Sequence, residues 1–300
     1  IMKKNLLIIT SRFDKGSFYQ ELTFGLVNLE TNIYLLEPHS GNKKFFEKVN
    51  GITIIRFPYF LPLKLQKLAY GSGIHYNFKH SLLAKFQLPL YCVSQLIHSI
   101  RLIKKYKIGM IHTHHLLLQG ITGSICSKLF KVPHVVTCHG SDIMFIKNKE
   151  FLKPLFLFIV KNSINVTVNS TYTKQILTEV GGLNINRIAH IIPMGVNLNR
   201  FIISKDRTES KLFGTDKIVL SVGRLIEWKG INYLINAMTT IVAHIPNVKL
   251  IIIGDGTERF KLEALVNKLE LNEIVLFLGK IENTNMPIYY RSSDIFVLPS

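Results

Sequence analysis

The chain has 300 residues, an apolar fraction of 47%, and 37 Lys and Arg against 19 Asp and Glu. This composition excludes an intrinsically disordered chain and allows one large or two medium domains. Three cysteines without a CxxC pair fit a reducing compartment better than a disulfide-rich secreted fold. No stretch of about 18 uncharged apolar residues predicts a membrane span, and the short apolar run near the start indicates a strand rather than a secretory signal.

In the first 200 residues, continuous apolar runs alternate with segments of helical periodicity. The runs predict strands near residues 5–10, 32–36, 52–56, 108–112, 134–138, 164–168 and 188–192. The segments between them predict helices near residues 18–29, 84–106, 117–130 and 171–180. Because strands that are apolar throughout are buried on both faces, the pattern predicts a parallel sheet covered by helices.

The same pattern starts again after a break near Pro193 and Gly195 and a polar stretch at 204–217. Strands are predicted near 217–222, 248–253, 274–278 and 295–298, with helices near 230–244, 257–270 and 285–292. We therefore predict an α/β protein of two Rossmann-like lobes with parallel sheets, residues 1–200 and 201–300, the second lobe incomplete. Ligands of such sheets bind beyond the carboxyl ends of the strands, so we expect a site in the cleft between the lobes.

The stretch SVGRLIEWKGINYL, residues 221–234, places two cations between a predicted strand and a predicted helix. Gly223 ends the strand and Gly230 opens the helix, with Arg224 and Lys229 between them. A helix N-terminus attracts anions through its unpaired N–H groups and its dipole. Arg and Lys at this position favour a diphosphate ligand, although a solvated loop with two surface cations fits the spacing equally well.

Two further glycine turns follow predicted strands. In IIIGDGTERFKLEAL, residues 251–265, a strand ends at Gly254, Gly256 completes a tight turn, and Thr257 is a candidate N-cap of the next helix. In TSRFDKGSF, Gly16 precedes a helix and could let backbone amides approach a phosphate. The turns at Gly223 and Gly254 give the second lobe two glycine turns at strand ends, which favours a nucleotide pocket. Ordinary strand–helix turns are the alternative.

The stretch VVTCHGSDIMF, residues 135–145, supplies candidate catalytic residues. A predicted buried strand ends in His139, Gly140, Ser141 and Asp142. His139 could donate a hydrogen bond to a leaving oxygen or to a substrate hydroxyl. The alternative is that Asp142 caps the following helix and that His139 is a loop histidine.

The stretch IHTHHL invites a metal interpretation, because His112 and His114 would lie on one face of a strand. No Cys, Asp or Glu stands near enough in the sequence to complete a ligand set, and the nearest acid is Asp142. We therefore predict no metal site.

The positive charge is concentrated in the first lobe. No acid stands between Glu47 and Asp142, whereas twelve Lys and Arg do. Residues 57–107 mix aromatic, aliphatic and basic side chains, and the predicted helix ends in a basic face made of Arg101, Lys104 and Lys105. This pattern suits an interfacial surface on anionic lipid. A core helix with a solvated basic edge is the alternative, and no nucleic-acid module is present to favour a nucleic-acid partner.

Taken in order, HTHH, TCHGSD, VNST, IIPMGVN, SVGRLIEWKG, IIIGDG and YYRSSDIFVLPS resemble the motifs of the retaining glycosyltransferases of the glycosyltransferase-four group. They cover nearly the whole chain. The resemblance implies the GT-B fold, a UDP- or GDP-sugar donor bound by the second lobe, and a lipid-linked or saccharide acceptor on the first. It also implies transfer with retention and without a metal, at the cytoplasmic face of a membrane.

The resemblance also implies roles for single residues. Arg224 and Lys229 would bind the donor diphosphate, His139 would lie beside the transferred sugar, and Gly16 would face the phosphates. The nucleoside would be bordered by the turn made of Gly254 and Gly256 and by the backbone at Lys280 and Ile281.

Two departures from the family pattern stand out. The first loop has a single glycine, in KGS, where the family has a pair. The family's paired glutamates would fall just after the LPS that ends this sequence, so we expect the 300 residues alone to have little activity. A sugar-nucleotide epimerase, a phosphorylase, and a non-catalytic lipid- or nucleic-acid-binding module remain the alternatives.

Overall fold

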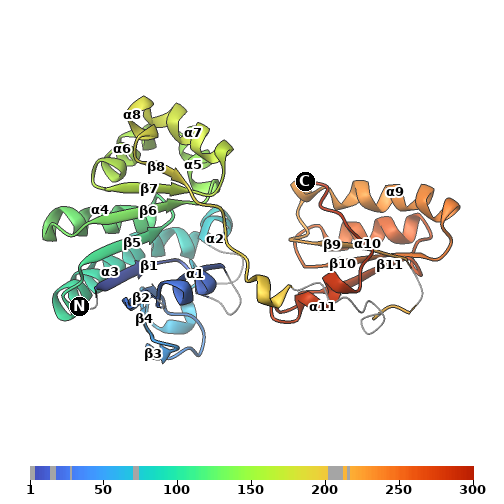
Figure 1. Cartoon of the computed structure of the whole chain (residues 1–300), viewed down its shortest axis with the longest axis horizontal. Coiled ribbons are helices and arrows are strands. Elements are labelled where there is room, and N and C mark those ends of the chain that lie inside the picture. Colours follow the sequence, from blue (N-terminus) through green and yellow to red (C-terminus); the bar gives the residue numbers. More distant parts are fainter. Residues whose placement is uncertain (1–3, 14–17, 28, 70–73, 202–211, 215–216) are drawn as a thin grey trace. The chain divides into compact units, whose positions relative to one another are not determined.

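The structure, a computed structural model, describes residues 4–13, 18–27, 29–69, 74–201, 212–214 and 217–300. The chain divides into two compact units, Ile1–Val196 and Asn197–Ser300. Each unit is an α/β layer structure with its own sheet. In Figure 1 the label N marks the first unit and the label C marks the second. The sequence placed this boundary after residue 200, inside the short segment that follows the last strand of the first unit.

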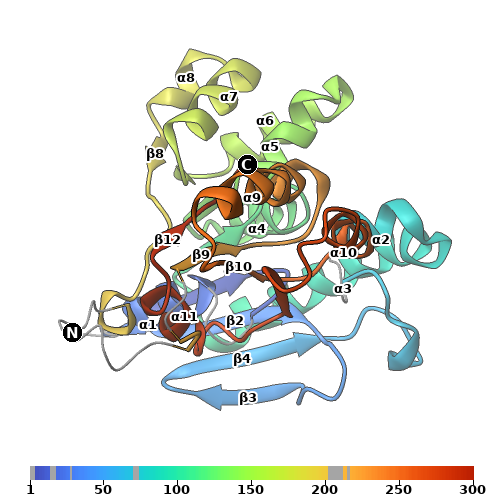
Figure 2. The ribbon, with the colours of Figure 1, turned by 90° about the vertical axis from the view of Figure 1, so that its right-hand side faces the viewer.

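The sheet of the first unit has eight strands in the order β3-β4-β2-β1-β5-β6-β7-β8. The strands are β1 (Asn5–Ile9), β2 (Asn32–Pro38), β3 (Phe46–Val49), β4 (Ile52–Phe57), β5 (Met110–His114), β6 (His134–Cys138), β7 (Asn165–Val168) and β8 (Ala189–Ile191). Every neighbouring pair is parallel except β3 and β4, which lie side by side at one edge (Figure 2). The sequence missed β3 because its four residues, FEKV, lack a continuous apolar run.

The central strands are apolar throughout because each packs on two hydrophobic layers. Leu7 and Ile9 of β1 join a core cluster with Tyr91, while Leu6 and Ile8 join a separate cluster with Leu35 and Phe13. All of these side chains are buried. A parallel strand between two helix layers needs apolar residues at every position, which confirms the prediction from the sequence.

The helices of the first unit connect these strands. They are α1 (Phe18–Val27), α2 (Ile74–His80), α3 (Leu82–Tyr106), α4 (Leu118–Phe130), α5 (Ser141–Lys147), α6 (Lys153–Lys161), α7 (Thr171–Gly181) and α8 (Leu183–Asn186). The sequence did not predict α2, α5, α6 or α8. The apolar stretch PLFLFIV lies in α6, where Phe156, Ile159 and Val160 are buried in the core. In the part of the chain that the structure describes, no helix has the length and apolarity needed to cross a membrane.

The second unit has a four-stranded parallel sheet in the order β11-β10-β9-β12. Its strands are β9 (Lys217–Val222), β10 (Val248–Ile253), β11 (Val275–Gly279) and β12 (Ile295–Phe296), and its α-helices are α9 (Ile231–His244), α10 (Arg259–Lys268) and α11 (Met286–Arg291). Alternate residues of β10 again enter two clusters: Leu250 and Ile252 in one, Ile251 and Ile253 in the other. The predicted fold class, two Rossmann-like α/β lobes with parallel sheets, is confirmed.

Candidate active site

A cluster of aromatic rings lies at the carboxyl edge of the first sheet, where β5 and β6 end. His114 is the last residue of β5 and His139 directly follows β6. Their rings stack with centroids 5.4 Å apart, and His114 Nδ1 lies 3.2 Å from His139 Nε2. His115 completes the group, with its ring centroid 4.7 Å from that of His139. Adjacent parallel strands therefore bring together histidines that are 25 residues apart in the sequence.

Burial makes these rings poor bases. It lowers the pKa of His139 to about 4, with His115 adding to the shift and Asp142 opposing it. It also lowers the pKa of His114 well below the ordinary value, helped by His112 and His139. Two neutral imidazoles can share one hydrogen bond, with one ring donating and the other accepting. At neutral pH His139 is therefore an uncharged hydrogen-bonding group and not a source of positive charge.

Tyr19 of α1 belongs to the same cluster. Its hydroxyl lies 3.1 Å from His115 Nε2, and its ring meets the edge of the His114 ring at a centroid distance of 4.8 Å. Burial, with a smaller contribution from Asp142, raises the pKa of its phenol. The sequence analysis missed both Tyr19 and His115. The available signal was that α1 follows β1, the strand next to β5, so its first turn reaches the same sheet edge.

The carboxylate of Asp142 connects the segments that follow β5 and β6. Its carboxylate accepts hydrogen bonds from the Leu116 amide (2.8 Å), the Ile143 amide (3.1 Å) and the Cys138 thiol (3.2 Å). The carboxylate is buried, and its Oδ2 lies 3.9 Å from His115 Nδ1. Gly140, not Asp142, is the N-cap of α5. These contacts favour a positioning role for Asp142, in which it fixes the β5–α4 loop against α5.

In the second unit, Arg224 and Lys229 stand in the loop between β9 and α9, as the sequence predicted. Arg224 is exposed, and Lys229 is half-buried with its ammonium 3.2 Å from Ser300 Oγ. Among the described residues neither cation has a carboxylate partner. Gly230, in the left-handed conformation with φ 64°, caps the N-terminus of α9. The loop therefore presents two cations, without a carboxylate partner among the described residues, beside the positive end of a 14-residue helix.

The glycines at 254 and 256 lie where two loops of the second unit meet. A Cβ at Gly254 would overlap the carbonyl oxygen of Gly223, and one at Gly256 would overlap the backbone of Leu225. Hydrogen bonds join the same two loops, from the Gly223 amide to Ile253 O and from the Leu225 amide to Asp255 O. The missing side chains let the β9–α9 and β10–α10 loops pack backbone to backbone. That this turn borders a nucleoside stays a prediction.

The remaining predicted residues are placed as follows. Ile281 follows β11 and packs its side chain against the cluster that contains Met286. Thr257 does not cap a helix, so that prediction was wrong: α10 begins at Arg259, and Glu258 occupies the N-cap position without a side-chain hydrogen bond. Gly16 lies outside the described residues.

The histidines of β5 at positions 112 and 114 were considered as metal ligands from their spacing. His112 and His114 lie on one face of the strand with ring centroids 4.4 Å apart. However, His112 Nε2 is 2.8 Å from Thr137 Oγ1, and burial lowers the pKa of His112 to about 4. Within the ranges that the structure describes, no three His, Cys, Asp or Glu side chains are grouped as metal ligands.

The fold is that of a two-lobed α/β protein, and comparison with known proteins gives its family. Residues 17–200 match the family described as Glycosyltransferase Family 4, and residues 203–300 match Glycosyl transferases group 1. Because the first match spans more than half of the chain, the protein belongs to glycosyltransferase family 4.

Individual relatives agree with this assignment. An uncharacterized glycosyltransferase of Methanocaldococcus jannaschii (MJ1178) is 31% identical over 77% of this chain and 60% of its own length. The alpha-monoglucosyldiacylglycerol synthase of Acholeplasma laidlawii is 26% identical over 91% of this chain and 67% of its own. The structure of sucrose-phosphate synthase from Thermosynechococcus elongatus, 22% identical, superposes with a TM-score of 0.75 over 99% of this chain and 76% of that one. The chain thus spans about two thirds or less of the length of these two curated relatives.

Proposed function

We propose that the whole protein transfers a sugar from a UDP- or GDP-linked donor to a lipid-linked or saccharide acceptor, with retention of configuration and without a metal. The observation that carries the donor proposal is the pair Arg224 and Lys229, which lacks a carboxylate partner among the described residues. The family membership of the chain supports a transferase. The name of the Acholeplasma relative, a diacylglycerol-modifying enzyme, supports a lipid acceptor.

In this proposal the two cations act where negative charge develops. Breaking the bond between sugar and diphosphate leaves charge on the departing nucleoside diphosphate, which Arg224 and Lys229 would neutralise together with the N-terminal amides of α9. Arg can bind two phosphate oxygens at once, whereas Lys acts as a single point charge. The same two residues would therefore bind the donor and lower the barrier.

The first unit would contribute a neutral hydrogen-bonding group. Because its pKa is lowered to about 4, His139 would reach a sugar hydroxyl as an uncharged imidazole. Its hydrogen bond with His114 orients the ring, and either of the two nitrogens can be the donor. Asp142 would position the loop beside His115 and would not touch the reacting atoms.

Binding of the donor tests this proposal without requiring turnover. Titration calorimetry should detect binding of UDP-glucose or GDP-mannose, and Arg224→Ala and Lys229→Ala should each weaken it about 10–100-fold, as expected for a charge-assisted contact. Lys268→Ala, at the last turn of α10, is the matched control and should bind as the parent does. If neither nucleotide sugar binds, or if both variants bind as well as the control, the donor proposal is wrong.

A further inference from the structure

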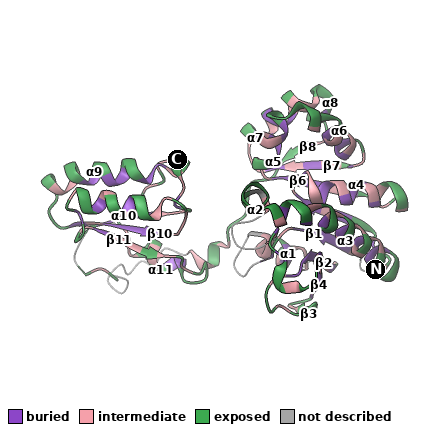
Figure 3. Cartoon of the chain, turned by 180° about the vertical axis from the view of Figure 1, so that it is seen from behind, coloured by how far each residue is buried: buried purple, intermediate pink, exposed green. Residues whose placement is uncertain are grey.

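The backbone of His115 is left-handed, at the carboxyl edge of the first sheet. Its φ is 78°, a conformation that is unfavourable for a residue with a Cβ. The other non-glycine residues described with a positive φ are exposed and lie in turns or at helix ends; they are Glu30, Asn50, Lys107, Lys131 and Glu270. Figure 3 shows the exposed end of α4, where Lys131 is the C-cap. His115 differs because it directly follows a strand and its side chain is only 30% exposed.

Backbone hydrogen bonds hold His115 in this conformation. Its amide donates to Thr137 O at 2.9 Å, and its carbonyl oxygen accepts from the Gly120 amide at 3.1 Å. The next amide in the chain, that of Leu116, donates to the Asp142 carboxylate. Strand β6 and helices α4 and α5 therefore fix this residue together. A strained residue that its surroundings hold in place is typical of a functional site.

The left-handed backbone places the His115 ring between a phenol and a carboxylate. Its Nε2 lies 3.1 Å from the Tyr19 hydroxyl oxygen, which is a hydrogen-bond distance, and its Nδ1 lies 3.9 Å from Asp142 Oδ2. Thr10, which is buried directly after β1, also hydrogen-bonds to the phenol. The first turn of α1 is thereby joined to the ends of β1 and β5 and to α5.

The charge of Asp142 favours one direction for the hydrogen bond between His115 and Tyr19. Burial lowers the pKa of His115, with Asp142 opposing the shift, so the ring is neutral at pH 7 and has one N–H hydrogen. A hydrogen on Nδ1 is attracted by the carboxylate, whereas a bare nitrogen lone pair at the same place is repelled. Nε2 is then the acceptor, and the Tyr19 hydroxyl donates to it. With its hydrogen directed to His115, the phenol oxygen meets a ligand as a hydrogen-bond acceptor.

We propose that His115 is a positioning residue, which directs the Tyr19 phenol oxygen toward a hydroxyl group of the molecule that receives the sugar. This inference rests on the proposed function and adds a group that recognises the acceptor. The acceptor hydroxyl donates its hydrogen to the phenol oxygen, while the phenol hydrogen stays on the side of His115. A site of this kind discriminates against an analogue that has no hydrogen to donate, because the hydrogen bond to the phenol oxygen is then lost.

Substitutions at position 115 test whether its backbone is strained. His115→Ala keeps the strain and His115→Gly relieves it, so chemical denaturation should give the glycine variant a folding equilibrium constant roughly fivefold larger. The same two substitutions at His112, inside β5, are the matched control. They should give the opposite order, since glycine weakens a strand. If alanine at 115 is as stable as glycine, the backbone is not strained and the proposal loses its basis.

Nitrogen-15 NMR of the imidazole tests the direction of the hydrogen bond. In the parent chain, Nε2 of His115 should have the chemical shift of a bare nitrogen and Nδ1 that of a nitrogen with a hydrogen. In Asp142→Asn the two forms should mix, because the charge that favours one of them is gone. The His115 signals are assigned by their absence from the His115→Asn spectrum. A hydrogen on Nε2 in the parent would overturn the proposed direction.

A pair of sugars tests recognition of a hydroxyl group. Methyl α-D-glucopyranoside is the probe, and its fully O-methylated form, which has no hydrogen to donate, is the comparison. The first sugar should shift the NMR signals of the Tyr19 ring, and the second should bind roughly 10-fold more weakly. Tyr19→Phe and His115→Asn should each weaken binding of the first sugar by a similar factor. The double variant should be no weaker than either single variant, because the two residues act as one unit.

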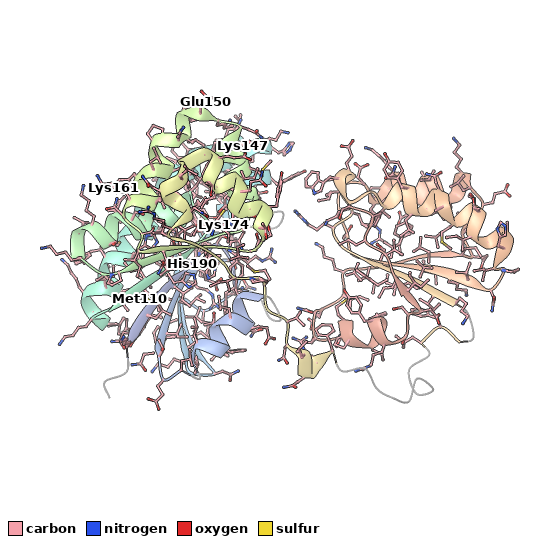
Figure 4. All side chains as sticks on the ribbon, turned by 45° about the horizontal axis from the view of Figure 1, so that its top comes forward. Met110, Lys147, Glu150, Lys161, Lys174 and His190 are labelled. Atoms are coloured by element: carbon pink, nitrogen blue, oxygen red, sulfur yellow. The ribbon has the colours of Figure 1, made fainter. Side chains whose placement is uncertain are left out.

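Two variants control for the loss of a phenol and of an imidazole elsewhere in the first unit. Tyr172→Phe removes an exposed hydroxyl on α7, and His190→Asn removes an exposed ring on β8, labelled in Figure 4. Both should bind the probe as the parent does, and circular dichroism shows whether each variant is folded.

Three outcomes of the sugar titrations would overturn the proposal. They are the absence of any shift at Tyr19, equal binding of the two sugars, and effects of Tyr19→Phe and His115→Asn that multiply in the double variant. Titration of the parent with UDP-glucose reports separately on the proposed function. A failure of donor binding alone rejects the proposed function and leaves the hydroxyl site of the first unit standing.

Discussion

The carboxyl edges of the two sheets occupy equivalent places in the fold, but side-chain contacts form the first and backbone contacts form the second. At the ends of β5 and β6, side chains fill the space, and the loops are joined through the buried carboxylate of Asp142. At the ends of β9 and β10, the loops touch directly through their backbones at Gly254 and Gly256. One edge is a network of neutral rings. The other is a close-packed frame beside which Arg224 and Lys229 have no carboxylate partner among the described residues.

This difference shows how one topology can support two kinds of binding surface. A side-chain network can place hydrogen-bonding groups such as His139 at chosen positions, but it depends on the protonation state of its members. The backbone frame is joined mainly by amide–carbonyl hydrogen bonds, which do not titrate, with one carboxylate contact, from the Gly256 amide to Asp255 Oδ1. The side chains of Arg224 and Lys229 are not part of these contacts. The two edges should therefore respond differently to substitution and to pH.

The largest expected effect comes from adding a methyl group inside the backbone frame. Gly254→Ala would place a Cβ on the Gly223 carbonyl at a φ of 138°. Overpacking and backbone strain together should destabilise the second unit by about 3 kcal/mol or more. Chemical denaturation of the variant measures this loss. Gly223→Ala is the control, since a Cβ there meets nothing within 4 Å, and equal stability of the two variants would refute the backbone contact.

Acid should weaken the first unit through its buried histidines. Burial lowers the pKa of His134, which contacts Thr113 and Ser163, to about 4. As the pH falls through 6.5, His134 binds a proton in the unfolded chain but not yet in the folded chain. The contribution of neutral His134 to stability is therefore fully present above pH 6.5 and is lost as the pH falls toward 4. The loss is up to about 3 kcal/mol for this residue alone.

Hydrogen exchange followed across this pH range separates the two units. Amides of β5 and β6 should lose protection between pH 6.5 and 4 to a greater extent than those of β9 and β10, because the only histidine of residues 197–300 is His244. In His134→Gln the slope of stability against pH should become shallower, even if the variant is less stable overall. An unchanged slope would show that His134 takes up no proton on unfolding.

Asp142→Ala should have a smaller but distinctive effect. It leaves the buried Leu116 amide without its acceptor, at a cost of about 1–3 kcal/mol in unfolding free energy. The control is Asp294→Ala in the second unit, whose carboxylate accepts from the Ile218 amide but is 41% exposed, so water can replace it. A loss no larger than that of the control would argue against the positioning role.

Asp142→Asn isolates the charge from the contact. The Asp142 carboxylate raises the pKa of His139 and His115 against the effect of burial. Removing its charge should lower the pKa of His139 further, and a titration of that ring followed by NMR detects the change. A pKa that stays in place would mean that the two groups do not interact.

The sequence predicted the fold well because a strand that is buried on both faces appears in the sequence as a continuous apolar run. Runs such as LLII in β1 and LIII in β10 are apolar at every position, and the helices between them are long enough to show a period. The sequence did not predict β3 or the seven-residue α5, because these elements are too short for a hydrophobic period to appear. These short elements depend on tertiary contacts and not on local propensity.

The candidate site was predictable only where its residues stand close together in the chain. Arg224 and Lys229 stand five positions apart in the same connection between β9 and α9, and Lys229 ends its short 3-10 helix η5 (Glu227–Lys229). The contact between Tyr19 and His115 joins residues 96 positions apart, so only the order of strands in the sheet brings them together. The glycines at 254 and 256 were correctly placed in a turn, but a single sequence cannot show that another loop lies against them.

The smallest expected change in stability completes the comparison. Arg224→Ala and Lys229→Ala should each change the free energy of unfolding by less than about 0.5 kcal/mol. Neither cation has a carboxylate partner among the described residues, and the Lys229 ammonium donates an exposed hydrogen bond to Ser300 Oγ. Denaturation of the same variants that are used for donor binding measures this directly. A residue that weakens binding 10-fold or more without weakening the fold acts on the ligand. If instead stability and donor binding fall together, the loop between β9 and α9 depends on its cations for its shape. The claim that Arg224 and Lys229 act on the ligand and not on the fold would then be wrong.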